Sequence, residues 1–327
     1  MQEPSSSLID SAADVLRNGG LVAFPTETVY GLGANACDPA AVRRIFEAKG
    51  RPADHPLIIH LHSLENLDFW ANDITESVWR LAEHFWPGPL TLILKRRHAP
   101  LTVTGGQETV GLRIPNHPVA LALLKAFNGG LAAPSANRFG KVSPTRAKHV
   151  RAELGDRVDL ILEGGPCRMG VESTILSLVD GQPRLLRPGS ISLSALQEVL
   201  GTEILTPTPA SNIRAPGMLK SHYSPETRFE LCPKDQLNRR GNELASSGLR
   251  TAVMFIGSAQ KEQPEPKAFT PLFMPEIPAD YARKLYAALR LLDNAEFDVL
   301  LAESPPDTEA WQAVNDRLKR ASYKNED

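Results

Sequence analysis

The sequence lacks the features that mark exported, membrane-spanning or metal-centred proteins. Its three cysteines are widely spaced and form no Cys-x-x-Cys pair, so neither a zinc ribbon nor a dithiol redox centre is indicated. The N-terminus has no basic segment followed by an apolar core, and no run reaches the roughly 18 apolar residues that a membrane span needs. We therefore expect a reduced, cytoplasmic protein that is neither exported nor embedded in a membrane.

The glycine-rich signatures of common nucleotide sites are missing as well. No G-x-x-x-x-G-K-[ST] run occurs, and the glycine-rich segment 164–170 precedes a predicted strand instead of opening a helix. No Ser-His-Asp order, H-E-x-x-H run or pair of spaced carboxylates stands out. A nucleotide would therefore have to be held by scattered cations and hydroxyl groups.

Neither sign of charge is in excess. The chain has 36 Lys and Arg against 38 Asp and Glu, a net charge of −2, so a polyanion would have to be met by a local patch. The best candidate patch lies in 138–157 and consists of Arg138, Lys141, Arg146, Lys148, Arg151 and Arg157. The same segment also fits a solvated helix face.

Amphipathic helices alternate with apolar strands over the first 200 residues. Helix starts are indicated by Ser7-x-x-Asp10 and by Asp38-Pro39, and a glycine-paced loop separates the first strand from the second helix. Helices are predicted over 8–16, 40–48, 75–85, 118–127, 145–154 and 193–200. Strands are predicted over 21–24, 57–61, 90–94, 110–114, 131–133, 160–162, 173–178 and 184–186. The pattern predicts a mixed sheet with helices on its faces.

The pattern changes after residue 200. Residues 201–228 contain four prolines and are interpreted as a linker between a catalytic domain, 1–200, and a C-terminal domain, 229–327. In the C-terminal domain, strands over 229–232, 252–256 and 299–302 alternate with helices over 236–246, 279–292 and 308–321. This pattern predicts a small three-layer α/β domain.

Two groups of basic residues are candidate ligand contacts. Lys49 and Arg51 flank Gly50, offering a point charge and a planar fork that suit a polyphosphate, although cations also complement the end of a helix. Arg113 interrupts an apolar strand, where it must pair with another group or face a cavity. A ligand carboxylate and a structural ion pair are both consistent with this position.

Hydroxyl and amide side chains follow the strand that ends near residue 133. Ser135, Asn137, Ser143 and Thr145 could bind a ligand at a strand end, but they could equally form a turn and a helix N-cap at Ser143. His60, within an apolar strand, is by itself more typical of a core histidine than of a ligand.

Eight short segments occur in one order over residues 25–189: PTETVYGLG, KGRP, HPLIIHL, FWPGPLTLIL, VGLRIP, APSAN, ESTI and LLRPG. Jointly, they resemble the YrdC-type threonylcarbamoyl-AMP synthases. The segment APGMLKSHYSP and the α/β domain after it are similar to the longer, two-domain form of that enzyme. The resemblance implies a YrdC-like twisted mixed sheet with flanking helices, followed by a small Rossmann-like three-layer domain.

The resemblance also implies an activity. L-threonine, bicarbonate and ATP would give L-threonylcarbamoyladenylate and diphosphate, with Mg²⁺ bound through ATP and no prosthetic group. The product would feed threonylcarbamoylation of the adenosine 3′ of the tRNA anticodon. The small-molecule partners would be ATP, L-threonine and bicarbonate, and the macromolecular partner would be the downstream tRNA threonylcarbamoyltransferase machinery. Direct binding of tRNA or another RNA is a further candidate interaction.

Site residues follow from the same resemblance. The K-x-R and S-x-N signatures fall on Lys49, Arg51, Ser135 and Asn137, which would be catalytic. ATP would be bound by Arg51, His55, Thr109, Ser135, Ser143, Arg187 and Tyr223. L-threonine would be bound by Thr28, His60, Arg113, Ser173 and the backbone of Ala133. His55 and Ala133 depart from residue types that are frequent in the family.

Two further expectations concern the linker and the alternatives. His222 and Tyr223 are predicted to form a lid, because a carbamate is labile in water and its site benefits from excluding solvent.

One alternative function is an RNA-binding module that uses the 138–157 patch. Another is a carbamoyltransferase-type YrdC domain, although the acylphosphatase and zinc-finger modules of that family are not visible in the sequence.

Overall fold

The structure, a computed structural model, describes residues 4–206, 213–258 and 268–323. The chain divides into two compact units. The first comprises Met1–Phe139, Ser143–Arg168 and Glu172–Met218, and the second comprises Gly140–Val142, Met169–Val171 and Leu219–Asp327. The division at Met218 falls inside the segment predicted as a linker. Among the described helices, none has the length and apolar character needed to cross a membrane.

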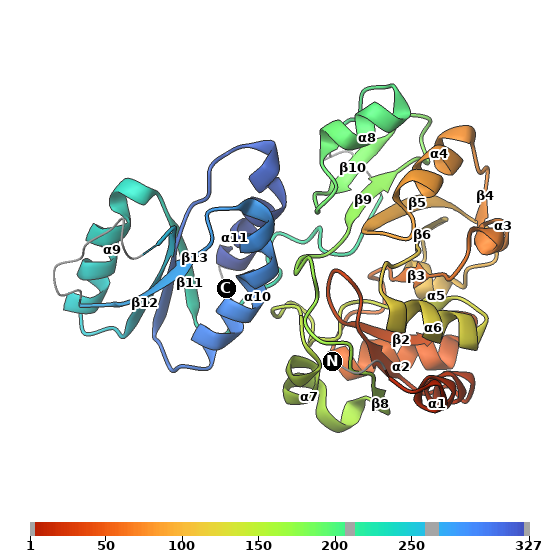
Figure 1. Cartoon of the computed structure of the whole chain (residues 1–327), viewed down its shortest axis with the longest axis horizontal. Helices are drawn as coiled ribbons and strands as arrows, with labels where there is room; N and C mark the ends of the chain where they lie inside the picture. The colour runs from red at the N-terminus through yellow and green to blue at the C-terminus, as the bar shows by residue number, and fades with distance from the viewer. Residues whose placement is uncertain (1–3, 207–212, 259–267, 324–327) are drawn as a thin grey trace. The chain divides into compact units, whose positions relative to one another are not determined.

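The first unit is built on a mixed sheet, as predicted, and this sheet has ten strands where eight were predicted (Figure 1). Its order is β10-β9-β5-β6-β3-β7-β2-β1-β8, with β4 beside β5. The strands are β1 (Val22–Phe24), β2 (Gly31–Asn35), β3 (Ile58–His60), β4 (Ala71–Asn72), β5 (Leu90–Arg96), β6 (Thr109–Arg113), β7 (Leu131–Ala132), β8 (Leu160–Ile161), β9 (Thr174–Ser177) and β10 (Arg184–Arg187). Strand β3 is parallel to β6 and antiparallel to β7, which places three segments with predicted site residues side by side.

Helices bury their apolar faces against this sheet. They are α1 (Ser6–Arg17), α2 (Pro39–Lys49), α3 (Leu67–Trp70), α4 (Glu76–Phe85), α5 (Leu101–Thr104), α6 (Pro118–Phe127), α7 (Ala147–Leu154) and α8 (Leu193–Leu200), with 3-10 turns η1 (Leu64–Asn66) and η2 (Gly155–Arg157). The larger apolar core includes side chains of α2, α4, α7 and α8, and a second core includes side chains of α1 and α6. Amphipathic helices are expected to be stabilised by such packing more than by propensity.

Two sequence-based details are wrong. The side chain of Ser5, not Ser7, caps α1 by accepting a hydrogen bond from the backbone of Leu8, because the helix already begins at Ser6. Strand β2 lies within the segment predicted as a glycine-paced loop. A Cβ on Gly33 would lie 2.8 Å from the Phe24 ring, so this glycine reflects close packing between neighbouring strands.

Helix α2 carries the first predicted cation into the site. The Asp38 side chain accepts hydrogen bonds from the backbone of Ala40 and Ala41, and Pro39 occupies the first turn, as predicted. Gly50 ends the helix in the left-handed conformation, with φ of 61°. Lys49 therefore occupies the last turn and Arg51 lies just beyond it, which confirms the expected placement.

The second unit contains a four-stranded parallel sheet of order β11-β14-β12-β13. Helix α9 covers one face, and α10 and α11 cover the other (Figure 1), so the three-layer prediction is confirmed. The elements are β11 (Arg228–Cys232), α9 (Lys234–Ser246), β12 (Thr251–Ile256), β13 (Thr270–Met274), α10 (Pro278–Asp293), β14 (Val299–Glu303), η3 (Glu309–Trp311) and α11 (Gln312–Ser322). Strand β13 escaped prediction because Pro271 obscures it, yet proline is tolerated on an edge strand.

Replacing the cap of α2 should destabilise the first unit. We expect Asp38→Ala to lower the free energy of unfolding by about 0.5 to 2 kcal/mol, because two backbone N–H groups lose their acceptor. Urea unfolding followed by tryptophan fluorescence would measure this, since Trp70, Trp79 and Trp86 lie in the first unit. Asp38→Asn keeps a capping oxygen and is the control. Equal losses in both variants would contradict the cap's contribution.

Candidate active site

Arg113 ends strand β6 beside the loop that joins β1 to β2. Its Nε donates to the carbonyl of Gly88 at 3.2 Å, and its Nη2 donates to Oγ1 of Thr28 at 3.0 Å. Nη2 also lies 2.8 Å from Oε1 of Glu27, and these two side chains are 4% and 1% exposed. The oxygen of Thr26 bonds to Thr28 and to the carbonyl of Val29, which fixes the loop.

His60 lies next to Arg113, because the two residues are paired in the register of β3 and β6. The imidazole is buried, and its Nδ1 makes no hydrogen bond to the described part of the protein. Burial and the neighbouring Arg113 charge lower the pKa of His60 to about 3. The ring is therefore neutral near pH 7. The core interpretation from sequence is correct about burial, but the position is also part of the Arg113 cluster.

Lys49 is a buried cation held by backbone oxygens. Its Nζ donates to the carbonyl of Ser135 at 2.5 Å and to the carbonyl of Asn137. The residue is 3% exposed. Burial, followed by repulsion from Arg51, holds the pKa of Lys49 well below its usual range. The K-x-R and S-x-N segments are thus in direct contact, as expected if they share a site.

Arg51 and His55 meet at one aromatic ring. The Arg51 guanidinium lies 5.4 Å from the centre of the Phe139 ring and donates to the carbonyl of Pro56 at 3.0 Å. His55 contacts the same ring edge-to-face, with centroids 5.1 Å apart. The pKa of His55 is lowered by burial and by the Arg51 charge. Phe139 was not identified from the sequence as a site residue. The only signal that could have indicated it is the presence of a single aromatic residue within a polar loop.

Arg187 and Ser173 form a third contact group. Nε of Arg187 donates to the Ser173 carbonyl at 3.1 Å, Nη2 contacts the Ser173 hydroxyl at 3.1 Å, and Nη1 reaches the carbonyl of Pro216 at 3.0 Å. Ser173 also shares a 2.8 Å hydrogen bond with Thr91. The structure therefore joins a residue predicted for ATP to one predicted for threonine.

Ser143 does not cap a helix. Helix α7 begins at Ala147, and the Ser143 hydroxyl instead donates to the buried carboxylate of Glu172 at 2.5 Å. The N-cap interpretation is thus wrong, because the chain turns before the helix starts. Glu172 is a second residue of this region that sequence reasoning did not select.

The remaining predicted residues occupy separate positions. Thr109 opens strand β6 and is half-buried, and the backbone N–H of Ala133 already donates to Ile58 at 2.9 Å. Tyr223 lies in the second unit, 1% exposed, with its ring 5.8 Å from Tyr286. His222 contacts Tyr223 in the same unit. The lid stays a prediction.

The basic segment 138–157 is only partly available to a polyanion. Arg151 pairs with Glu163 at 2.6 Å, and Arg157 donates to the carbonyl of Ala48 at 3.2 Å. Lys141 belongs to the second unit and lies 3.4 Å from Glu226. RNA binding by this patch stays a prediction.

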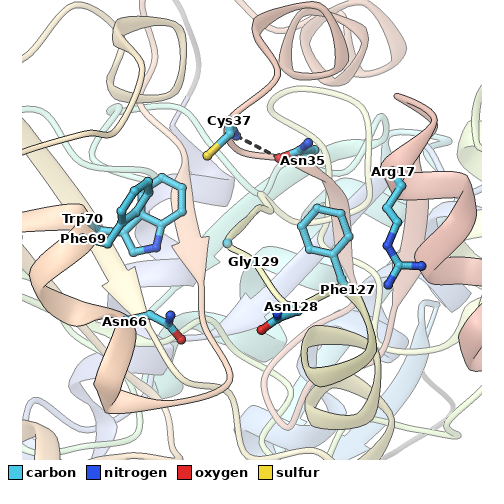
Figure 2. Close-up of a pocket in the computed structure, with 10 residues that line it drawn as sticks. Arg17, Asn35, Cys37, Asn66, Phe69, Trp70, Phe127, Asn128 and Gly129 are labelled. Atoms are coloured by element: carbon cyan, nitrogen blue, oxygen red, sulfur yellow. Dashed lines mark hydrogen bonds between the residues drawn. The ribbon is translucent and has the colours of Figure 1, made fainter.

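A separate pocket of about 420 Å³ lies at the other end of β2 and α2 (Figure 2). Figure 2 shows Phe69 and Trp70 on one side of Gly129, and Phe127 and Arg17 on the other. Cys37 is part of its wall, and its backbone N–H donates to Asn35 at 3.0 Å. This pocket contains none of the predicted site residues.

Comparisons with known proteins agree over the whole chain. The family model described as "Telomere recombination", for Sua5, YciO and YrdC proteins, matches residues 14–189. A second model, "Threonylcarbamoyl-AMP synthase, C-terminal domain", matches residues 191–322. The chain is 42% identical to threonylcarbamoyl-AMP synthase of Pyrococcus abyssi, covering 95% of this chain and 93% of that protein. It is 40% identical to the Bacillus subtilis enzyme, covering 96% and 92%.

Solved structures give the same result. The crystal structure of P. abyssi Sua5 complexed with L-threonine has a TM-score of 0.89 and 41% identity, and the match covers 98% of this chain and 96% of that one. Escherichia coli YciO has a TM-score of 0.53 and 26% identity, and the match covers 60% of this chain and 95% of that one. The YciO match shows that the likeness to that protein is limited to part of the chain.

The exposure of the thiols allows a chemical test of this geometry. Cys37 is exposed, whereas Cys167 and Cys232 are 3% and 6% exposed. We expect iodoacetamide to alkylate Cys37 alone in the native protein, as mapped by peptide mass spectrometry. Because partial burial raises the pKa of Cys37, alkylation should be slower than for a free cysteine and should accelerate as the pH rises. Cys37→Ser is the control, and comparable labelling of a buried thiol would contradict the structure.

Proposed function

Because the chain belongs to the Sua5/YciO/YrdC family and also carries the C-terminal domain of threonylcarbamoyl-AMP synthases, we propose that it makes L-threonylcarbamoyladenylate. The substrates are L-threonine, bicarbonate and ATP, and diphosphate is the second product. Full-length similarity to enzymes of that name supports the assignment, because the relatives and this chain cover each other almost completely.

The observation that carries this proposal is a short backbone segment, residues 133–137. It connects the cluster around Arg113 and His60 to the cluster around Lys49 and Arg51. The N–H of Ala133 donates to Ile58, two residues before His60, at the threonine end of the segment. At the other end, the carbonyls of Ser135 and Asn137 accept from Lys49. We assign an amino-acid subsite to one end of residues 133–137 and a phosphate subsite to the other, because this arrangement suits the joining of an amino acid to a nucleotide.

Threonine occupies the cluster around Arg113 in this proposal. Its carboxylate binds the Arg113 guanidinium, whose planar fork matches a carboxylate. Thr28, Ser173 and the backbone of Ala133 orient the rest of the amino acid. Neutral His60 can accept or donate a hydrogen bond without adding charge.

The nucleotide occupies the second cluster. The triphosphate lies near Lys49, Arg51 and Arg187, and His55, Thr109, Ser135, Asn137 and Ser143 provide polar contacts around it. The amine of threonine condenses with bicarbonate to give a carbamate and water, and a carbamate oxygen then attacks the α-phosphorus of ATP and expels diphosphate. Both steps concentrate negative charge, which buried cations stabilise more strongly than solvated ones do.

Mg²⁺ accompanies ATP in this proposal. Across the described ranges, no three His, Cys, Asp or Glu side chains gather at one point that could hold a metal ion. Mg²⁺ does not need such a group of side chains, because it keeps several waters and binds mainly through phosphate oxygens. When bound, Mg²⁺ would neutralise charge on the phosphates, and Lys49, Arg51 and Arg187 are the residues of the protein that contribute to the same task.

The remaining parts of the proposal concern what surrounds the reaction. His222 and Tyr223 act as a lid that keeps water from the carbamate, and the product passes to the tRNA threonylcarbamoyltransferase machinery in the cytoplasm. An enzyme without a tight seal would lose carbamate to hydrolysis or decarboxylation.

Diphosphate release with each substrate omitted in turn tests the activity. We expect release from ATP to require both L-threonine and bicarbonate, because only the carbamate supplies the attacking oxygen. A coupled phosphate assay with added pyrophosphatase would measure it. Equal release without threonine would show that ATP is being hydrolysed or used for another reaction.

Removing the Arg113 guanidinium tests the threonine subsite. We expect Arg113→Ala to raise the KM for threonine about ten- to a hundredfold, since a charged hydrogen bond contributes roughly 1.5 to 3 kcal/mol. The KM for ATP should change much less. Arg184→Ala, on strand β10, removes a half-buried arginine outside the cluster and is the matched control. An unchanged threonine KM in Arg113→Ala would remove this residue from the subsite.

A further inference from the structure

Glu27 is a buried carboxylate whose hydrogen bonding is incomplete. The residue is 1% exposed, and neither of its oxygens accepts a hydrogen bond from the described part of the protein. Its Oε1 lies 2.8 Å from Nη2 of Arg113 in an ion pair, and the same Nη2 donates to Oγ1 of Thr28. Buried carboxylates are rarely left in this state without a functional reason.

A neighbouring polar group is also incomplete. Nδ1 of His60 is buried without a hydrogen-bond partner in the described part of the protein. His60 is paired with Arg113 in the register of β3 and β6, and Arg113 is in turn paired with Glu27. Unsatisfied polar atoms from β3 and from the loop after β1 indicate that a polar ligand completes the cluster.

The charges of this cluster cancel without a ligand. Glu27 contributes one negative charge and Arg113 one positive charge. His60 is neutral, and burial raises the pKa of the nearby Cys167 thiol, which keeps it protonated. A ligand that carried only a carboxylate would compete with Glu27 for Arg113 and leave one buried negative charge without compensation. A zwitterion adds a positive charge as well and keeps the cluster neutral.

We propose that Glu27 makes the Arg113 subsite selective for a zwitterionic α-amino acid. It holds Arg113 in place for the carboxylate, and its negative charge compensates the ammonium group on the adjacent carbon. The role is one of specificity, which the residues assigned above do not supply, because Thr28, His60 and Ser173 carry no charge. The inference rests on the proposed function, since threonine is the ligand considered there.

The test compares the binding of a zwitterionic and a purely anionic ligand to the unaltered protein and to the Glu27→Gln variant. Calorimetry on the full chain would measure binding of L-threonine and of 2,3-dihydroxybutanoate, which has a hydroxyl in place of the ammonium. The unaltered protein should bind threonine at least about tenfold more tightly. In Glu27→Gln, threonine should bind about ten- to a hundredfold more weakly, while the dihydroxy acid should bind as well as before or better. The preference for the zwitterion would then be small or reversed.

Each contrary outcome has a distinct meaning. Equal weakening of both ligands in Glu27→Gln would show that Glu27 only supports Arg113, and an unchanged preference would show that its charge is not sensed; either overturns the inference. Failure of the unaltered protein to bind threonine would overturn the proposed function and, with it, this inference. Binding is measured without ATP, so a failure of turnover alone does not affect the result.

Two variants protect the test against loss of folding. Glu27→Asp keeps the charge and should retain the preference for threonine even if both ligands bind more weakly; loss of the preference here would contradict the proposal. Glu303→Gln removes another buried carboxylate, 4% exposed and located in the second unit, and should leave the preference unchanged. A changed preference in Glu303→Gln would mean that general destabilisation, not the charge of Glu27, alters binding.

Discussion

The cost of burying positive charge is the constraint on which the candidate active site depends. Lys49, Arg51, Arg113 and Arg187 are each less than a tenth exposed, at 3%, 8%, 4% and 3%. Removing such groups from water is unfavourable unless other polar groups replace the water. Backbone carbonyls do this for Lys49, Arg51 and Arg187, and a carboxylate pairs with Arg113. Carbonyl dipoles solvate a cation without cancelling its charge, so the region near the first three remains suited to an anion.

This constraint explains why the surrounding backbone is irregular. A carbonyl outside a strand or helix has both lone pairs available for a side chain, and the acceptors of Lys49 lie just after the short strand β7. Helix α2 stops at Gly50 in the left-handed conformation, so the chain reverses and places Arg51 against Phe139. The Arg113 cluster, by contrast, is tied to the sheet through the β3–β6 register, and its charge is balanced locally by Glu27. In the proposed function, the polyanion is therefore assigned to the first three cations, and a ligand that is neutral overall is assigned to the Arg113 cluster.

Much of the fold could be predicted because its signals are local. The Asp38 cap, the proline after it and Gly50 define α2, and apolar runs define β3, β5 and β6. Strand β2 could not be predicted because Gly33 has no side chain to give a pattern, and its reason for being glycine is the Phe24 ring on the next strand. Ser143 was ambiguous for a similar reason: a serine before proline fits a cap, and only its contact with Glu172 decides against one.

The sequence by itself determined most of the element order and the two-part organisation. Through the order of its short segments, it also determined the family and identified the charged residues of the candidate site. Only the tertiary structure decided which of those residues meet. In the folded protein, Lys49 donates to carbonyls of the S-x-N segment and Arg187 donates to Ser173. Glu27 forms an ion pair with Arg113, and its two oxygens accept no hydrogen bond from the described part of the protein. The physical reason is that local propensities depend on neighbours along the chain. Burial, hydrogen-bond satisfaction and charge compensation instead depend on atoms brought together by the sheet from segments far apart in the sequence.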